Sequence, residues 1–236
     1  MADASSVGPF VVLTGAGVSA ESGLATFRDA GGLWEGHRVH DVATPSAFAR
    51  DPVLVHRFYN ERRARLRDPA IAPNPAHLAL AELERRWPGE FLLVTQNVDD
   101  LHERAGGCRL VHIHGELMRA LCRACGVSAR WEGDLGVDSV CPSCAAAGQL
   151  RPDIVWFGEM PYRLDEVYGA LERCGTFVAI GTSGVVYPAA GFVAAARGAR
   201  TIEINFEPSA VSSAFAERRH GPAAKIVPSL VRELLR

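Results

Sequence analysis

The sequence predicts an α/β fold in which a doubly wound parallel sheet carries a smaller inserted domain. Two observations support this class. Short apolar runs rich in β-branched residues alternate with stretches of helical periodicity, which is typical of a parallel sheet covered by helices. Long segments of different character interrupt the alternation, and one of them carries two pairs of closely spaced cysteines. The insertion is therefore predicted to consist of a helical module and a four-cysteine zinc module.

The first buried strand is predicted over Phe10–Thr14, and it runs directly into a glycine-rich segment. The spacing from Gly15 to Ala20 fits the dinucleotide-binding pattern G-x-G-x-x-G/A, in which the second glycine, here Gly17, lets a pyrophosphate approach the backbone. We expect a helix to follow, with its first amides forming the anion site. A purely structural turn is the alternative, because the strand that should carry the acidic residue of this fingerprint, about 20 positions further on, has no counterpart in the sequence.

The segment after the glycine turn predicts helices. Thr44-Pro45-Ser46 starts a short helix, and Pro52 starts a longer one that continues to Arg67. Asn74 is a predicted N-cap followed by a proline, and the helix after it ends at Trp87-Pro88-Gly89. Its length of about three to four turns suits a crossover helix of the sheet.

Further buried strands complete the predicted sheet. They are expected at Phe91–Thr95, Leu110–His114, Ile154–Phe157, Thr176–Ile180 and Thr201–Ile204, with helices at Asp165–Arg173 and Ala189–Arg197 and a last amphipathic helix that opens at Pro228. Asp99 or Asp100 is expected to cap a short helix from Leu101 to Gly106.

Composition limits the partners. The net charge of −2 and the dispersed arginines give no footprint for nucleic acid or for an anionic membrane surface. No apolar run has the length of a membrane span, and Met1–Ser6 lacks the basic region of a signal peptide. We therefore expect a cytoplasmic protein. The sequence does not determine its oligomeric state, for which a monomer is the expectation.

Four cysteines have the spacing of a zinc site. Cys122 and Cys125 form one C-x2-C pair, Cys141 and Cys144 form the other, and fifteen residues separate the pairs. Four thiolates leave no open coordination position, so one structural zinc ion is predicted. The rival interpretation, two disulfides, requires an oxidising compartment for which the chain carries no signal.

Polar residues follow the predicted strands. Ligands of open α/β sheets gather beyond the carboxyl ends of the strands, so these residues are candidates for one site, although each alone could be a helix cap or a turn. His112 and His114 share a face of their strand, and His114 at its end could act as a general base near neutral pH or be a structural histidine. The candidates at the other strand ends are Gln96, Asn97, Asp99, Gly181, Thr182, Ser183 and Asn205.

Together these motifs resemble the sirtuins of bacterial type, a family of NAD-dependent protein deacylases. The resemblance covers nearly the whole chain. It rests on Gly15–Gly23, Thr26-Phe27-Arg28, Thr95-Gln96-Asn97-Val98-Asp99, His112-Ile113-His114-Gly115, the four cysteines, Val155–Glu159 and Gly181-Thr182-Ser183.

The resemblance implies a Rossmann-like NAD-binding domain made of residues 1–33, 91–117 and 151–236. A mainly helical module, 34–90, whose last helix is a crossover of the large domain, and a zinc-binding module, 118–150, complete the chain. NAD would bind between the domains and be consumed as a co-substrate. The residues implied to bind it are Gly15, Ala16, Gly17, Ser19, Ala20, Phe27, Arg28, Gln96, Asn97, Asp99, Gly181, Thr182, Ser183, Asn205 and Ala223.

The implied reaction removes an acyl group from a lysine of a protein or peptide. The acyl carbonyl oxygen attacks C1′ of the nicotinamide ribose, nicotinamide leaves, and His114 acts as general base on the ribose hydroxyls. The products are nicotinamide, 2′-O-acyl-ADP-ribose and free lysine. Asn97 is the second implied catalytic residue, and the substrate peptide would pair as a strand with Val155, Trp156, Phe157 and Gly158.

Tyr59 and Arg62 lie three positions apart in the chain and so share a helix face. They resemble the Tyr-x-x-Arg motif of class III sirtuins, which reads the carboxylate of succinyl-, malonyl- and glutaryl-lysine, and Ala30 matches the small residue that makes room for these acyl chains. An arginine fork can bind a carboxylate through two hydrogen bonds. The resemblance therefore implies desuccinylase-like activity together with some deacetylation, whereas a solvated basic helix is the simpler alternative.

Two other functions stay open on the sequence alone. An NAD-dependent ADP-ribosyltransferase would share the first step and differ in the acceptor. A non-catalytic, NAD-sensing zinc module would bind the nucleotide without turnover.

Overall fold

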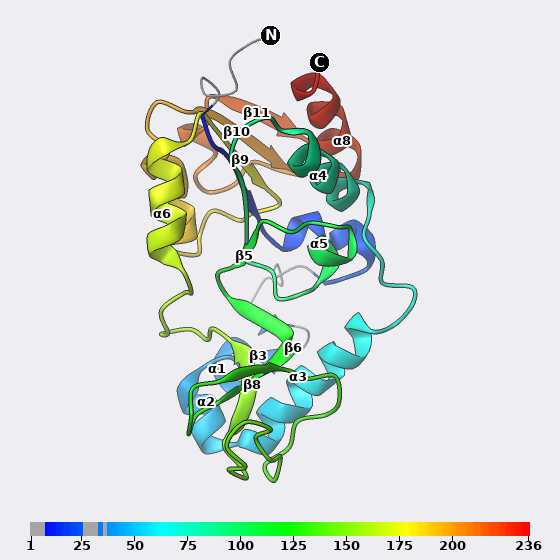
Figure 1. Ribbon diagram of the computed structural model, residues 1–236, viewed down its shortest axis with the longest axis vertical. Coiled ribbons are helices and arrows are strands. Elements are labelled where there is room, and N and C mark those ends of the chain that lie inside the picture. The colour runs from blue at the N-terminus through cyan, green and yellow to red at the C-terminus, as the bar shows by residue number, and fades with distance from the viewer. Residues whose placement is uncertain (1–7, 26–32, 35–36) are drawn as a thin grey trace.

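The computed structural model describes residues 8–25, 33–34 and 37–236, whose two main sheets lie at opposite ends of the molecule (Figure 1). None of the helices in these ranges combines the length and the apolar character that a membrane crossing needs.

The large sheet has six parallel strands in the order β11-β10-β9-β1-β4-β5. From the central β1 the chain builds outward to β5, returns to β9 on the other side of β1 and builds outward to β11. This is the strand order of doubly wound dinucleotide-binding sheets, so the predicted fold class is confirmed. The strands are β1 (Phe10–Thr14), β4 (Phe91–Thr95), β5 (Leu110–His112), β9 (Thr176–Ile180), β10 (Arg200–Asn205) and β11 (Glu217–His220).

Helices cover both faces of the large sheet. Phe10 and Val12 of β1 pack with α4 (Pro75–Arg86) and α8 (Ala223–Leu234), whereas Val11 and Leu13 pack with α6 (Leu164–Arg173) and α7 (Phe192–Ala195). Successive side chains of a strand point to opposite faces, so a strand buried on both faces is a continuous apolar run. This explains why β1 could be predicted from the sequence.

The small sheet is antiparallel, in the order β7-β6-β8. Helices α1, α2 and α3 pack against it around Phe48, Phe58 and Trp156, which are all buried. A further pair of short strands, β2 and β3, is also antiparallel. The elements are β2 (Leu33–Trp34), β3 (His37–Arg38), α1 (Val39–Val42), α2 (Pro45–Arg50), α3 (Pro52–Leu66), β6 (Gly115–Cys122), β7 (Ser128–Arg130) and β8 (Leu150–Ile154).

The predicted strand Ile154–Phe157 of the large sheet is wrong. Ile154 is the last residue of β8, which pairs with β6 in the small sheet, and residues 155–157 lie outside the strands. Two residues of the run, Ile154 and Trp156, are buried in the core of the small sheet, whereas Phe157 is exposed. We retain the predicted domains as a proposal: an NAD-binding domain of 1–33, 91–117 and 151–236, a helical module of 34–90 and a zinc module of 118–150. The pairing of β6 with β8 nevertheless places 115–117 and 151–154 of the first domain in the small sheet.

The helix expected after the glycine turn is absent from the described residues. Two 3₁₀ turns, Ala16–Val18 and Ala20–Ser22, take its place, and Gly23 ends the second turn in the left-handed region with φ 84°. Turns this short lack the aligned peptide dipoles of an α-helix. The predicted anion site at a helix N-terminus is therefore wrong in this form.

The C-terminal part differs from the prediction in three elements. The last helix, α8, begins at Ala223 and contains Pro228 in its interior, because its buried stripe of Ala223, Val227, Leu230 and Val231 extends to both sides of the proline. The edge strand β11 has the polar sequence Glu-Arg-Arg-His, which carries no apolar run and was missed. The helix expected at 189–197 is a 3₁₀ turn followed by the four residues of α7. Earlier in the chain, α5 (Leu101–Arg104) also ends before its predicted end.

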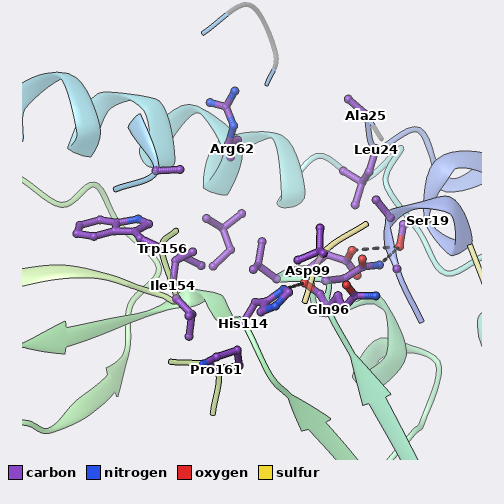
Figure 2. A pocket seen from close by; sticks show the side chains of 18 of the residues that line it. Ser19, Leu24, Ala25, Arg62, Gln96, Asp99, His114, Ile154, Trp156 and Pro161 are labelled. Carbon is purple, nitrogen blue, oxygen red and sulfur yellow. Dashed lines mark hydrogen bonds between the residues drawn. The ribbon is translucent and has the colours of Figure 1, made fainter. Parts of the chain in front are cut away.

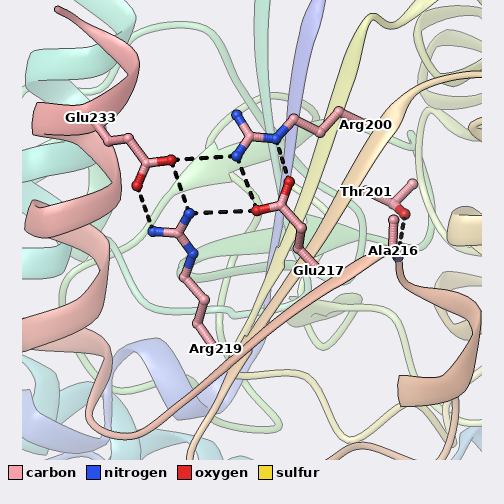
Figure 3. Close-up of polar contacts among 6 residues, drawn as sticks. All are labelled: Arg200, Thr201, Ala216, Glu217, Arg219 and Glu233. Atoms are coloured by element: carbon pink, nitrogen blue, oxygen red, sulfur yellow. Dashed lines mark hydrogen bonds and ion pairs between the residues drawn. The ribbon is translucent and has the colours of Figure 1, made fainter.

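Two arginines and two glutamates tie the edge strand to its neighbours (Figure 3). Arg200 of β10 donates two hydrogen bonds to Glu217 of β11, at 2.5 and 2.9 Å. Arg219 of β11 donates two to Glu233 of α8, at 2.9 and 3.0 Å. Hydrogen bonds from these guanidinium groups lower the pKa of both carboxyls. The network fastens an otherwise open sheet edge, which charged side chains also protect from pairing with other chains.

We expect this network to stabilise the fold only while its carboxylates are ionised. A carboxyl whose pKa is lowered by folding stabilises the protein above its unfolded pKa, about 4.3 for glutamate, and this stabilisation is lost as the pH falls through the folded pKa. Glu217→Gln/Glu233→Gln should therefore lower the unfolding temperature at pH 7 and have little effect at acidic pH. Glu82→Gln, which removes an isolated exposed pair with Arg86, is the control. Equal effects of both variants at every pH would contradict the role of the network.

Candidate active site

A cavity of about 330 Å³ lies beyond the carboxyl ends of β1, β4 and β9 and reaches the small sheet (Figure 2). It brings together most of the residues predicted from the sequence: Gly15, Ala16, Gly17, Ser19, Tyr59, Arg62, Gln96, Asn97, Asp99, His114, Val155, Trp156, Phe157, Gly158, Gly181, Thr182 and Ser183. Lining residues that the site prediction did not include are Leu24, Ala25, Ala43, Arg65, Leu66, Val98, Leu117, Ile154, Glu159, Pro161, Val186 and Tyr187.

Of the NAD- and substrate-binding residues that were predicted and that the structure describes, three are not among those that line the cavity. Ala20 lies in a 3₁₀ turn, and Asn205 is buried and donates a 2.6 Å hydrogen bond to the carbonyl of Thr182. Ala223 begins α8, where the next amide donates to Glu21 at 2.8 Å. Phe27, Arg28 and Ala30 lie outside the described residues.

The glycine turn packs backbone to backbone against Gly181. The amide of Gly15 donates to Ile180 O and that of Gly17 to Gly181 O, both at 3.0 Å. A Cβ atom on Gly17 would lie 2.6 Å from the Cα of Gly181, so a side chain there would separate the two segments. The glycine therefore serves the approach of two chain segments at the switch point of the sheet, whereas its contact with a pyrophosphate stays a prediction.

Ser19, Asn97 and Asp99 form a buried hydrogen-bonded group on the floor of the cavity. The Ser19 hydroxyl donates to Asp99 Oδ2 at 3.0 Å and accepts from Asn97 Nδ2 at 3.1 Å. Burial raises the pKa of Asp99 to about 6, although hydrogen bonds from Leu101 N–H and from Ser19 oppose the shift. The amide oxygen of Asn97 is not used by this group, so the side chain can turn an acceptor toward a ligand.

His114 is held as a base. Its Nδ1 lies 3.1 Å from Gln96 O. Because a carbonyl oxygen only accepts, Nδ1 carries the proton and Nε2 keeps its lone pair. Burial lowers the pKa of His114, so the neutral form prevails at neutral pH. Gly115 follows with φ 81°, and a Cβ there would lie 2.1 Å from Asp153 O.

His112 has the opposite environment. Its Nδ1 lies 3.0 Å from Asn97 O and its Nε2 lies 2.7 Å from the Glu103 carboxylate. Burial alone would lower the pKa of His112, but the hydrogen bond and charge of Glu103 outweigh it and raise that pKa. This histidine fixes the backbone beneath Asn97. His112 could be recognised from its sequence motif, whereas nothing in the sequence marks Glu103, nine positions earlier, as its partner.

Helix α3 forms the outer wall of the cavity. Tyr59 is fully buried, and its hydroxyl accepts a 3.0 Å hydrogen bond from Trp156 Nε1. Arg62 donates to Phe58 O at 2.6 Å, and its guanidinium lies 3.1 Å from the centre of the Phe58 ring. Figure 2 shows Arg62 on α3, across the cavity from His114. The predicted acyl-reading pair therefore borders the same cavity as the predicted base.

The four predicted zinc ligands converge. Cys122 Sγ and Cys144 Sγ lie 3.8 Å apart, as do Cys125 Sγ and Cys141 Sγ, and all four sulfurs lie within 4.8 Å of one another. Four sulfurs placed tetrahedrally at about 2.3 Å from zinc are separated by about 3.8 Å, so the donor set fits this ion. Such a site is closed and would supply stability to the small sheet, with no coordination position for a substrate.

The fold and the cavity define an α/β protein with a nucleotide-binding switch point and a cysteine metal site. The profile of the Sir2 family matches residues 15–188, and the chain belongs to this family. It is 59% identical over 225 residues to an NAD-dependent protein deacylase of Bdellovibrio bacteriovorus, which covers 95% of this chain and 96% of that protein. The resemblance to sirtuins is confirmed.

Solved structures of the family have the same fold. A Sir2 homologue in complex with NAD has a TM-score of 0.86 and 40% identity, covering 96% of this chain and 89% of that one. A Sir2 complex with a p53 peptide and NAD+ has a TM-score of 0.79 and 26% identity, covering 98% of this chain and 95% of the other.

We expect the purified protein to contain about one zinc ion per chain and to lose stability on chelation, because binding of a structural metal contributes folding free energy. Metal analysis and thermal unfolding measure both effects. Cys125→Ser should release the ion, whereas Cys108→Ser, at an exposed thiol outside the cluster, should retain it. A metal-free protein of unchanged unfolding temperature would refute the zinc site.

Proposed function

We propose that this chain is an NAD-consuming deacylase that acts on acylated lysines of proteins or peptides. The observation that carries the proposal is His114, which is neutral and has its lone pair on Nε2. This histidine lines the same cavity as the glycine turn and the segment Val155–Gly158. The relatives named NAD-dependent protein deacylase and the Sir2 complexes with NAD and with a peptide agree with it.

NAD would extend from the glycine turn to His114. Main-chain amides near Gly15–Gly17 and the polar groups at the ends of β9 and β10 would receive its phosphates and adenosine, and the Ser19, Asn97 and Asp99 group would receive the nicotinamide end. The residues proposed to bind it are Gly15, Ala16, Gly17, Ser19, Ala20, Phe27, Arg28, Gln96, Asn97, Asp99, Gly181, Thr182, Ser183, Asn205 and Ala223.

His114 would take a proton at Nε2. In the proposed reaction the acyl carbonyl oxygen bonds to C1′ of the nicotinamide ribose as nicotinamide departs, and His114 accepts the proton of the ribose hydroxyl that then attacks the acyl carbon. Water completes the release of free lysine and 2′-O-acyl-ADP-ribose. Asn97, with its side chain held by Ser19 and its backbone by His112, would position the ribose during these steps.

The acyl-lysine would enter from the side of the small sheet, next to Val155–Gly158. The amides of Val155 and Phe157 already donate to His114 O, at 2.9 Å, and to Ala43 O, at 3.0 Å. Pairing with a peptide strand would therefore use carbonyl groups of this segment more than its amides.

Succinyl-lysine peptide and NAD should yield nicotinamide and 2′-O-succinyl-ADP-ribose in equal amounts, measured by mass spectrometry, and His114→Asn should lower the rate by about 10²–10⁴-fold. ADP-ribose attached to protein without that product would instead indicate an ADP-ribosyltransferase, and nucleotide binding without turnover would indicate a sensing module.

The rate should fall on the acidic side of neutrality. The neutral form of His114 is the base, and its pKa is lowered, so activity should persist at pH 7 and decline only below the ordinary histidine pKa of about 6.5. Asp99, with a pKa raised to about 6, also titrates in this range. If the activity of an Asp99→Asn variant still declines at acidic pH, the decline belongs to His114. If the decline is lost in this variant, it belongs to Asp99.

We further propose that Tyr59 and Arg62 favour acyl groups that end in a carboxylate, such as succinyl, malonyl and glutaryl. Arg62 borders the cavity from the wall opposite His114, and its guanidinium would exchange the Phe58 carbonyl for the acyl carboxylate. Acetyl-lysine offers no such partner and would be a poorer substrate. Ala30 is proposed to leave room for the longer chains.

Arg62→Met should lower kcat/KM for succinyl-lysine by about ten- to a hundredfold and that for acetyl-lysine far less, because a charge-assisted pair is worth about 1.5–3 kcal/mol. Matched peptides that differ only in the acyl group provide the comparison. Arg57→Met, at an exposed position of the same helix, is the control and should leave both substrates unaffected. Equal losses on both substrates in Arg62→Met would refute the acyl-reading role.

A further inference from the structure

An ion pair between buried Arg151 and partly exposed Glu159 lies at the segment proposed to receive the peptide. Arg151 of β8 is 8% exposed and donates to Glu159 through both terminal nitrogens, at 2.6 and 2.9 Å. One of these nitrogens also donates to Ile154 O at 2.7 Å. Neither residue belongs to the NAD-binding or acyl-reading groups described above. Removing a guanidinium from water is costly, and here it is offset by three charge-assisted hydrogen bonds that fix the position of Arg151.

Glu159 closes the turn that carries Trp156. Its carboxylate accepts from Trp156 N at 2.8 Å, and its own amide donates to Trp156 O at 2.9 Å. Between them, Gly158 has φ 91°, a left-handed conformation that suits glycine. The carboxylate therefore accepts from the amide of Trp156, which lies outside the strands, and fixes the path of Val155–Gly158.

Arg151 also holds the Trp156 ring. Its guanidinium carbon lies 3.4 Å from the centre of the ring, a cation–π stack. The same Trp156 ring donates through Nε1 to the Tyr59 hydroxyl at 3.0 Å. One arginine thus connects the turn beside the peptide to the helix that borders the acyl pocket.

We propose that Arg151 and Glu159 are positioning residues for the acyl-lysine substrate. Their ion pair sets the Trp156–Glu159 turn and seats the Trp156 ring against Tyr59, so the peptide side and the acyl side of the cavity form one rigid wall. The NAD side, built on the large sheet, does not depend on them. This inference rests on the proposed deacylase function, since it names residues that serve the binding of its acyl-lysine substrate.

The test separates positioning from folding. Glu159→Gln leaves the buried Arg151 charge without its counter-charge and should destabilise the protein more than Arg151→Met, which leaves the partly exposed Glu159, whereas Arg151→Met/Glu159→Met removes both charges and should recover much of the stability. The double variant should nevertheless bind a fluorescent succinyl-lysine peptide about ten- to a hundredfold more weakly, because a misplaced wall costs about this much. Its affinity for NAD should stay within about twofold of the wild type.

Two further variants sharpen the result. Arg151→Lys keeps the charge but loses the two-pronged bond and the flat stack on Trp156, so it should also weaken peptide binding. Arg163→Gln, which removes an exposed pair with Glu166 at 2.6 Å, is the matched control and should bind peptide normally. In the wild type, Trp156 fluorescence, assigned by difference from Trp156→Phe, should change on peptide addition, and this change should be reduced in the double variant.

A stable double variant with wild-type peptide affinity would overturn the positioning role, and so would equal losses for NAD and peptide. Peptide binding is measured without turnover, so these outcomes are distinct from failure of the proposed function. That failure would be a wild-type protein that does not prefer acylated over unacylated peptide, or that binds the acylated peptide and releases no nicotinamide from NAD.

Discussion

The close approach of the Gly15–Gly17 turn to Gly181 sets the geometry around it. It joins the end of β1 to the end of β9, the two strands between which the direction of winding reverses. A Cβ atom at Gly15, Gly17 or Gly181 would meet backbone within 3 Å, so these three positions tolerate no larger residue. The polar groups after β4 then face the same space, because the carboxyl ends of parallel strands share one edge. Ser19 reaches Asn97 and Asp99 only because the turn is held there.

Two histidines of one short segment have pKa values shifted in opposite directions, because their surroundings differ. His112 has a carboxylate on Nε2, which raises its pKa, whereas burial lowers the pKa of His114, whose Nδ1 meets only a carbonyl. A neutral carbonyl orients an imidazole without stabilising its charged form as strongly as a carboxylate does. The first histidine is thus suited to hold the backbone of Asn97, and the second to accept a proton for a short time.

The parts predictable from the sequence are those with local signals. Strands such as β1 and β4 are buried on both faces and so are continuous apolar runs, and the cysteine spacing places four sulfurs around one point. The edge strand β11 was not predicted because its sequence, Glu-Arg-Arg-His, contains no apolar residue. The run Ile154–Phe157 was assigned to the wrong sheet because an apolar run indicates burial but not which sheet buries it. Pairs such as Glu103 with His112 and Arg151 with Glu159 depend on where the chain turns, which the residue types alone do not reveal.

The position of His114 between the sheets has a mechanical consequence. Its ring is bonded to Gln96 at the end of β4, its carbonyl accepts from Val155 after β8, and the next residue begins β6. The residue is therefore attached to both ends of the molecule at their junction. In a rotation of one end against the other about this junction, displacement grows with distance from the axis, so His114 would move less than residues farther from the junction. The proposed base is thereby fixed to the large sheet and to the small sheet at once, so its position does not depend on either one alone.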